Sequence, residues 1–227
     1  MIIGKGATGQ GMNYSVDIVM CIDATGSMYS IIDDVKKNAL SFYQKFVDEM
    51  ETVKKSVQQL RIKVIAFRDF AEDSEPMVES KFFVLNDEVE EFHNFVNGIV
   101  ASGGGDAPEN SLEALALAMN SDWVTTGDIR RHVIIMYTDA QPLPLGTHSG
   151  QSSYPAGMPA DLAELHEWWE GQKMEKRAKR LLVFAPDVEP WPDMVGWTNA
   201  FHTASQAGHG CDDTDIQTCI RLLVNSI

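Results

Sequence analysis

The stretch VDIVMCIDATGSM, residues 16–28, joins an apolar run to a short segment of small polar residues. Its first seven residues are mostly apolar, which is typical of a strand buried inside an α/β sheet. Three oxygen-bearing side chains then follow at alternate positions, namely Asp23, Thr25 and Ser27. The stretch therefore predicts a buried first strand that ends in polar side chains at the sheet edge where α/β proteins bind ligands.

Strand-like and helix-like segments alternate along the rest of the chain. The expected strands span residues 16–22, 61–67, 81–85, 132–137, 181–185 and 201–204. The expected helices span residues 31–50, 87–99, 109–119, 161–179, 193–200 and 214–224. This alternation predicts a Rossmann-like α/β fold, in which a doubly wound, mostly parallel sheet of about six strands carries helices on both faces.

The composition and net charge limit the kinds of partner that the chain is expected to bind. The chain has 227 residues, of which 44% are hydrophobic and 22% charged, as in ordinary globular proteins. Its net charge of −15 argues against binding to nucleic acid or to anionic membranes, because both need clustered Lys and Arg. The three cysteines form no CxxC pair, and the apolar runs have only strand length. A cytoplasmic protein without a membrane span is therefore expected.

Two segments stand apart from the regular pattern. Residues 1–13 form a Gly-rich leader, and its GxGxxG match precedes the first strand, whereas a dinucleotide-binding loop must follow one. Residues 14–227 are expected to form a single domain. Within that domain, residues 141–160 are rich in Pro, Gly and Ser and lack periodicity. Long loops of this kind in compact domains are usually functional or disordered, and this one follows the expected strand at 132–137, so it is expected at the carboxyl edge of the sheet.

Two further loops carry acidic residues at matching places. Asp106 lies in GGGDAPEN before an expected helix, and Asp139 lies in YTDA after an expected strand. A helix cap by Thr25 or Ser27 explains one oxygen of the first loop but hardly all of them. Carboxylates gathered without a Lys or Arg in these loops would repel one another, so a hard cation is expected among them. Mg²⁺ is the first candidate, with Mn²⁺ or Ca²⁺ as alternatives.

Together these motifs resemble those of the von Willebrand factor A domain family over about residues 14–227. The metal-ion-dependent adhesion site of that family uses a DxSxS first loop, a Thr in a second loop and an Asp in a third. The resemblance implies that Asp23, Thr25 and Ser27 form the first loop, with Thr25 in place of the usual Ser, and that Asp139 forms the third. Asp106 stands about where the second-loop Thr is expected, which makes the site more anionic than usual.

The combination of DxTGSM, FRDF and GGGDxPE resembles one branch of the family, that of the hemicentin-type, α-kinase-linked and tellurite-resistance-associated A domains. Arg68 and Asp69 of the FRDF segment are interpreted as a turn with a local ion pair. The resemblance to this branch implies an intracellular setting in a multi-protein stress or defence complex.

The resemblance implies a divalent-metal-binding module for protein–protein interaction. A partner's acidic side chain could complete the metal shell, although the added charge of Asp106 would weaken that contact. His148, Tyr154 and Trp191 are candidate partner-binding residues near the same edge. The alternatives are a metal-dependent hydrolase or phosphotransferase, and a metal-stabilised scaffold that binds no ligand. None of the three loops offers an obvious nucleophile or tuned general base, so the sequence favours a protein that is not an enzyme.

Overall fold

A mostly parallel sheet forms the centre of the computed structural model, which describes residues 13–104, 108–204, 217, 220–221 and 223–225. Its strands are β1 (Asn13–Asp23), β2 (Ser56–Phe67), β3 (Met77–Glu79), β4 (Phe83–Val84), β5 (Ile129–Tyr137), β6 (Lys179–Ala185) and β7 (Ala200–Ala204). The order is β3-β2-β1-β5-β6-β7, and β4 also pairs with β2. Only β3 and β4 run antiparallel to their neighbour. The Rossmann-like fold predicted from the sequence is confirmed.

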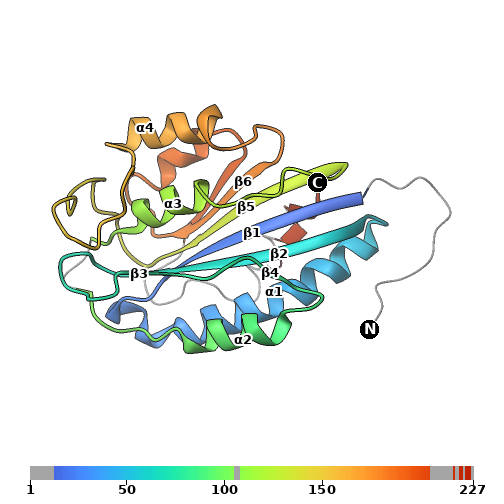
Figure 1. Cartoon of the computed structure of the whole chain (residues 1–227), viewed down its shortest axis with the longest axis horizontal. Coiled ribbons are helices and arrows are strands. Elements are labelled where there is room, and N and C mark those ends of the chain that lie inside the picture. Colours follow the sequence, from blue (N-terminus) through green and yellow to red (C-terminus); the bar gives the residue numbers. More distant parts are fainter. Residues whose placement is uncertain (1–12, 105–107, 205–216, 218–219, 222, 226–227) are drawn as a thin grey trace.

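Helices cover both faces of the sheet, as Figure 1 shows. On one face lie α1 (Ile32–Thr52) and α2 (Val89–Gly98), and on the other lie α3 (Ser111–Met119) and α4 (Leu162–Glu167). Three shorter helical turns are also described: η1 (Gly26–Ser30), η2 (Trp168–Gln172) and η3 (Pro192–Gly196). None of the described helices is long and apolar enough to cross a membrane.

The sheet separates two hydrophobic cores, and β1 contributes to both. Ile18, Met20 and Ile22 pack into the core beneath α1 and α2, whereas Val19 and Cys21 pack into the core beneath α3 and α4. Successive side chains of a strand point to opposite faces, so a strand covered on both sides must be apolar at nearly every position. This is why residues 16–22 form an almost uninterrupted apolar run.

Some element boundaries differ from the prediction. The strand predicted at 81–85 is only Phe83–Val84, and a separate short strand, Met77–Glu79, precedes it. The helix predicted to begin at Asp87 begins at Val89 instead. The residue before it, Glu88, makes no side-chain capping bond. The segment predicted as a helix at 193–200 is a 3-10 turn followed by β7. Residues 1–12 of the predicted leader lie outside the described residues, whereas Asn13 already belongs to β1. Of the closing helix predicted at 214–224, the described residues 217, 220, 221, 223 and 224 are helical, and the rest lie outside the described residues.

The long helix predicted for residues 161–179 is wrong in its second half. After α4 the chain continues as the π-helical turn η2, where Gly171 adopts a non-helical backbone with φ 170°. Lys179 then belongs to β6, is fully buried, and donates hydrogen bonds to the Trp169 carbonyl and, at 3.2 Å, to Glu170. The helix ends at this non-helical backbone, and the chain pairs with β5 from Lys179 onward.

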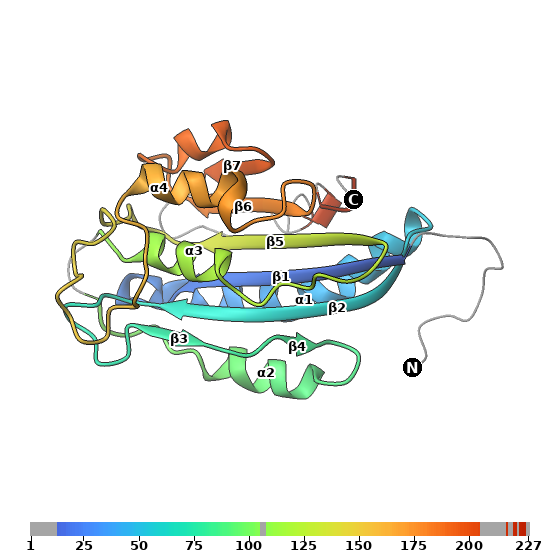
Figure 2. The same cartoon turned by 45° about the horizontal axis from the view of Figure 1, so that its top comes forward.

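The loops that follow the parallel strands gather at one edge of the sheet. In Figures 1 and 2 they lie together at the left, because β1, β2, β5 and β6 all run in that direction. Residues 141–160 lie at this edge as a series of turns, with one isolated bridge between Pro142 and Glu109. The edge thus brings together segments that are far apart in the sequence.

Candidate metal centre

Asp23 is the last residue of β1 and its side chain is fully buried. Its Oδ1 accepts hydrogen bonds from the Thr25 N–H at 2.9 Å and the Thr25 hydroxyl at 2.6 Å. Its Oδ2 accepts a bond of 2.7 Å from the hydroxyl of Thr138, which follows β5. Burial raises the pKa of Asp23 to about 6; the charge of Asp139 adds to this rise, and these hydrogen bonds oppose it. Asp23 therefore joins the first loop to the third.

The hydroxyls of Thr25 and Ser27 lie side by side between two carboxylates. The Thr25 hydroxyl donates to Asp23, and the Ser27 hydroxyl donates to Oδ1 of Asp139 at 3.0 Å. The two hydroxyl oxygens are 3.1 Å apart. Since each hydroxyl has a single proton and that proton is engaged by a carboxylate, lone pairs of both oxygens remain available for another ligand.

This oxygen pair fits a small divalent cation. Octahedral coordination of Mg²⁺ at 2.0–2.1 Å places neighbouring ligand oxygens about 3 Å apart, which matches the separation of the two hydroxyls. Among the described residues, no three His, Cys, Asp or Glu side chains are grouped so as to hold an ion by themselves. A cation at this edge would therefore need the hydroxyls of Thr25 and Ser27 as well as carboxylates. Thr25 precedes η1 without a side-chain capping bond, and the hydrogen-bond contacts of the Ser27 hydroxyl are to the side chains of Thr25 and Asp139.

Three glycines bring the second loop against the first. The Gly26 N–H donates to the Gly103 carbonyl at 3.0 Å. Gly104 has φ +70°, and a Cβ added there would lie 2.9 Å from Thr25 Cβ and 3.2 Å from Glu109 Oε1. Such a close approach, in a left-handed backbone conformation, requires glycine. Asp106 lies outside the described residues, so its place in the site stays a prediction.

Glu109 is a site residue that the sequence interpretation missed. It directly precedes Asn110 and α3, and only 3% of its surface is exposed. Its Oε2 has no hydrogen-bond partner in the described part of the chain. Burial raises the pKa of Glu109 to about 8, and four surrounding carboxylates add to the rise: Asp23, Asp69, Asp139 and Asp73. In the sequence an acidic residue at a helix start is ordinary, so only its burial reveals it.

Hydrogen bonds from the Arg68 side chain connect three loop segments. Its guanidinium donates to the carbonyls of Ala24 at 3.1 Å, Val100 at 2.7 Å and Glu75 at 3.3 Å. The ion pair expected between Arg68 and Asp69 is not found among the described residues. The Arg68 guanidinium donates its hydrogen bonds to backbone carbonyls instead. Arg68 therefore holds the first loop against the segment that follows α2.

His148 and Tyr154 attach the 141–160 loop to α3. His148 Nδ1 lies 3.0 Å from Asn110 Oδ1 and 3.4 Å from Asp69 Oδ1. The Tyr154 hydroxyl donates to Oε1 of the buried Glu113 at 3.0 Å. These polar atoms are therefore engaged within the chain, and a role for the two residues in partner binding stays a prediction.

Trp191 was expected to face a partner, but its side chain is completely buried. Its indole N–H donates to the Ala140 carbonyl at 3.0 Å. The ring is thus part of the core beneath α3 and α4, and it supports the third loop directly after Asp139. A buried ring cannot touch a partner, so this expectation is corrected.

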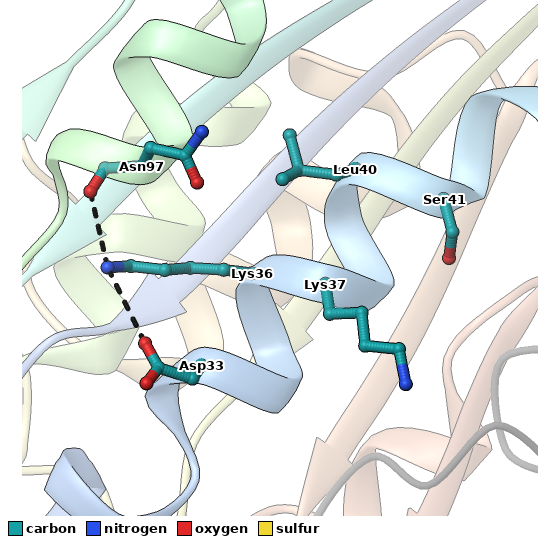
Figure 3. A pocket seen from close by; sticks show the side chains of 6 residues that line it. All are labelled: Asp33, Lys36, Lys37, Leu40, Ser41 and Asn97. Carbon is teal, nitrogen blue, oxygen red and sulfur yellow. Dashed lines mark hydrogen bonds and ion pairs between the residues drawn. The ribbon is translucent and has the colours of Figure 1, made fainter.

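A cleft of about 480 Å³ lies between α1 and α2, as Figure 3 shows. It is lined by Asp33, Lys36, Lys37, Leu40, Ser41 and Asn97. Lys36 Nζ donates to the Asn97 carbonyl at 3.3 Å and lies 3.9 Å from Asp33 Oδ1. Two lysine ammonium groups make this cleft unsuited to a cation, and the Lys36 contact stabilises the end of α2.

Comparisons with known proteins agree with this description. Residues 17–144 match the family model of the von Willebrand factor A domain. The alpha-protein kinase vwkA of Dictyostelium discoideum is 28% identical over 144 residues, which are 63% of this chain. The chain covers only 21% of the length of that kinase.

Three solved structures share the fold at low sequence identity. The pilus adhesin SpaC of Lactobacillus rhamnosus GG superposes with a TM-score of 0.59 at 11% identity, over 95% of this chain and 31% of the adhesin. A von Willebrand factor type A protein of Catenulispora acidiphila gives 0.55 at 15% identity, over 93% and 42% of the two chains. Proximal thread matrix protein 1 of the mussel byssus gives 0.51 at 13% identity, over 95% and 49%. Because the family model also matches more than half of the 227 residues, this chain belongs to the von Willebrand factor A domain family.

Proposed function

We propose that this chain is a protein–protein interaction module that depends on a divalent cation. The cation, Mg²⁺ first and Mn²⁺ or Ca²⁺ as alternatives, would bind at the carboxyl edge of the sheet. The observation that carries the proposal is the pair of hydroxyls on Thr25 and Ser27, 3.1 Å apart, whose protons are directed to Asp23 and Asp139. This arrangement leaves oxygen lone pairs together at a fixed spacing.

Each residue of the site has a distinct part in this proposal. Thr25 and Ser27 would bind the cation through neutral oxygens, while Asp23 and Asp139 orient those hydroxyls and provide negative charge. Asp106 would add a further carboxylate from the second loop. The bound cation would supply an electrophilic centre that accepts an oxygen atom from a partner protein, with an acidic side chain as the candidate that the family resemblance implies.

Exposed apolar side chains near this edge support docking of a partner. Tyr29 lies two residues after Ser27 and is 80% exposed. Val100, in the segment that follows α2, is 60% exposed, and Val195, on η3, is 55% exposed. Exposed aromatic and apolar side chains beside a polar site are candidates for contact with a partner protein.

The family supports the same role. von Willebrand factor A domains typically mediate protein–protein interaction, and one protein of similar fold is described as a pilus adhesin. The setting implied by the resemblance, an intracellular multi-protein stress or defence complex, belongs to this proposal and rests on kinship alone. The kinase activity named for the relative from Dictyostelium discoideum is not part of it.

The first test is calorimetric titration of MgCl₂ into the metal-free protein. We expect one bound cation in the wild type and a loss of affinity on the order of tenfold to a hundredfold in Asp23→Ala, because the hydroxyls lose the group that orients them. Asp33→Ala is the matched control, since its side chain is 96% exposed and lies outside the site. A wild-type protein that binds none of the three candidate cations would contradict the proposal.

The second test addresses the partner. Proteins captured from a lysate by the wild type should be lost on addition of EDTA and in Asp23→Ala, and should be retained in Asp33→Ala. Capture that is unchanged by both EDTA and Asp23→Ala would show that the interaction does not depend on the cation.

A further inference from the structure

Glu109 differs from the other buried acidic residues that the structure describes. Asp17, fully buried, accepts two hydrogen bonds from Arg61, at 2.8 and 2.5 Å. Glu113, also fully buried, accepts bonds from the Tyr154 hydroxyl at 3.0 Å and from the Asn110 amide at 3.3 Å. Glu109 is 3% exposed, and its Oε2 has no partner within the described residues. A buried carboxylate without a partner is costly, so its retention requires a reason.

The charged groups that act most strongly on Glu109 are all acidic. Asp23, Asp69, Asp73 and Asp139 each repel a negative charge on Glu109. Asp73 accepts the N–H groups of Asp69 at 3.2 Å and Gly104 at 3.0 Å, so backbone bonds hold this part of the cluster in place. The Glu109 carboxyl group, whose Oε2 has no partner among the described residues, is therefore repelled by several acidic side chains, and a bound cation would relieve this repulsion.

The Gly104 backbone shows how close Glu109 lies to the first loop. A single point, the position of a Cβ on Gly104, is 3.2 Å from Glu109 Oε1 and 2.9 Å from Thr25 Cβ. The glutamate oxygen and the threonine that carries one hydroxyl of the proposed site therefore both lie close to the Gly104 backbone. Glu109, at the end of the second loop, therefore has a side-chain oxygen close to the part of that loop that contacts Thr25.

We propose that Glu109 is a carboxylate ligand that binds the cation directly beside the hydroxyls of Thr25 and Ser27. The inference rests on the cation site proposed above and adds an anionic oxygen from the second loop to it. In this arrangement the carboxylates of Asp23 and Asp139 accept the hydroxyl protons, and Glu109 supplies negative charge in contact with the ion. Hard cations such as Mg²⁺ favour this kind of ligand.

The backbone of Glu109 connects the cation to the 141–160 loop. The Glu109 N–H donates to the Gln141 carbonyl at 2.9 Å, and the Leu143 N–H donates to the Glu109 carbonyl at 2.7 Å. The side chain that binds the cation and the backbone that holds the root of the loop therefore belong to one residue. Cation binding through Glu109 would restrain the loop that carries His148 and Tyr154.

The test compares Glu109→Gln with Glu113→Gln, a matched removal of charge from a buried glutamate one helical turn away. In titrations with MgCl₂ and MnCl₂ we expect Glu109→Gln to lose on the order of tenfold or more in affinity and Glu113→Gln to retain the wild-type value. In the metal-free state Glu109→Gln should unfold at the same or a higher temperature than the wild type, because the neutral amide is not repelled by the surrounding carboxylates. Hydrogen exchange in residues 141–145 should slow on addition of Mg²⁺ in the wild type and not in Glu109→Gln.

The outcomes separate this inference from the function on which it rests. Equal cation affinity in Glu109→Gln and the wild type would overturn the role of Glu109 and leave the cation site standing. A wild type that binds no cation would overturn both. Glu109→Asp keeps the charge and withdraws the oxygens by one methylene, so it should also weaken binding; wild-type affinity in that variant would count against direct contact, even if Glu109→Gln failed to fold.

Discussion

Glu109 and Asp23 are carboxylic acids whose burial favours the protonated form. Their pKa values are raised to about 8 and about 6, against ordinary values of about 4 for both residue types. The folded chain therefore holds these protons more tightly than the unfolded chain does. The stability that this provides is present below about pH 4 and is lost as the pH rises through the raised pKa of each group.

The resulting prediction concerns the metal-free protein. Between pH 6 and pH 8 its free energy of unfolding should fall, by at most about 1.4 kcal/mol per pH unit for the one proton on Glu109. Urea denaturation in EDTA at pH 6, 7 and 8 measures this fall. Glu109→Gln should flatten the profile, because Asp23 has already lost its proton over most of this range. A wild-type profile that stays level or rises would contradict the raised pKa of Glu109.

A second prediction for a single residue concerns Gly104. In Gly104→Ala the new methyl group would lie 2.9 Å from Thr25 Cβ on a backbone with φ +70°, so the first loop must shift. We expect a loss of about 1–3 kcal/mol in stability together with weaker Mg²⁺ binding. Urea denaturation and titration of MgCl₂ measure the two effects. Gly150→Ala is the control, because an added Cβ there meets nothing within 4 Å, and it should leave both quantities unchanged.

The part of the site that follows the parallel strands could be predicted from the sequence. Asp23, Thr25 and Ser27 directly follow an apolar run, and Asp139 follows another, so the direction of parallel strands was enough to bring them together. Glu109 could not be recognised, because its distinguishing property is a missing hydrogen-bond partner. That property depends on how loops distant in sequence pack around it, which no local pattern records.

At the level of elements, the 141–160 loop depends on contacts with α3. Tyr154→Phe removes the hydroxyl that donates to buried Glu113 at 3.0 Å and accepts from the Gly146 N–H at 3.1 Å. Because a buried acceptor loses its partner, we expect a loss of about 1–2 kcal/mol and faster hydrogen exchange over residues 146–154. Tyr29→Phe is the matched control, since Tyr29 is 80% exposed, and it should change neither. Unchanged exchange in Tyr154→Phe would mean that other contacts hold the loop.

Another contact between elements joins α1 to α2. Lys36 Nζ donates to the Asn97 carbonyl in the last turn of α2, where a positive charge is favourable, as Figure 3 shows. Lys36→Met keeps the apolar stem and removes the charge, so we expect a loss of about 0.5–1 kcal/mol in urea denaturation. Lys37→Met, on the neighbouring position, should cost less. Equal effects of the two variants would show that only overall charge matters.

Elements buried on both faces were the most predictable ones. β5 and β6 lie inside the sheet, and their apolar runs predicted them to within a few residues. The short strands β3 and β4 pair only with β2 and are partly exposed, so their sequences carry a weaker signal. The second half of the helix predicted at 161–179 was wrong, although its sequence has an amphipathic pattern. There the deciding factor was pairing of Lys179 with β5, a contact distant in sequence.

At the scale of the whole molecule, one strand connects stability with the proposed site. β1 contributes to both hydrophobic cores and ends at Asp23, whose carboxylate is hydrogen-bonded to the loops after β1 and β5. Bringing acidic side chains together at that end opposes folding while no cation is present, and the chain already carries a net charge of −15. The two cores must therefore offset the repulsion, and a cation that binds only the folded chain should add directly to its stability.

The last prediction measures this linkage. At a Mg²⁺ concentration of about 100 times the dissociation constant, binding to the folded state alone adds about 2.7 kcal/mol. For a chain of this size that corresponds to a rise of roughly 5–10 °C in the unfolding temperature, measured by calorimetry against an EDTA-treated sample. NaCl at matched ionic strength should give a smaller rise, because it screens the net charge without occupying the site. Asp23→Ala, whose affinity should be tenfold to a hundredfold weaker, should gain less than the wild type from the same Mg²⁺ concentration. An equal response of the wild type to the two salts would show that charge screening alone stabilises the fold.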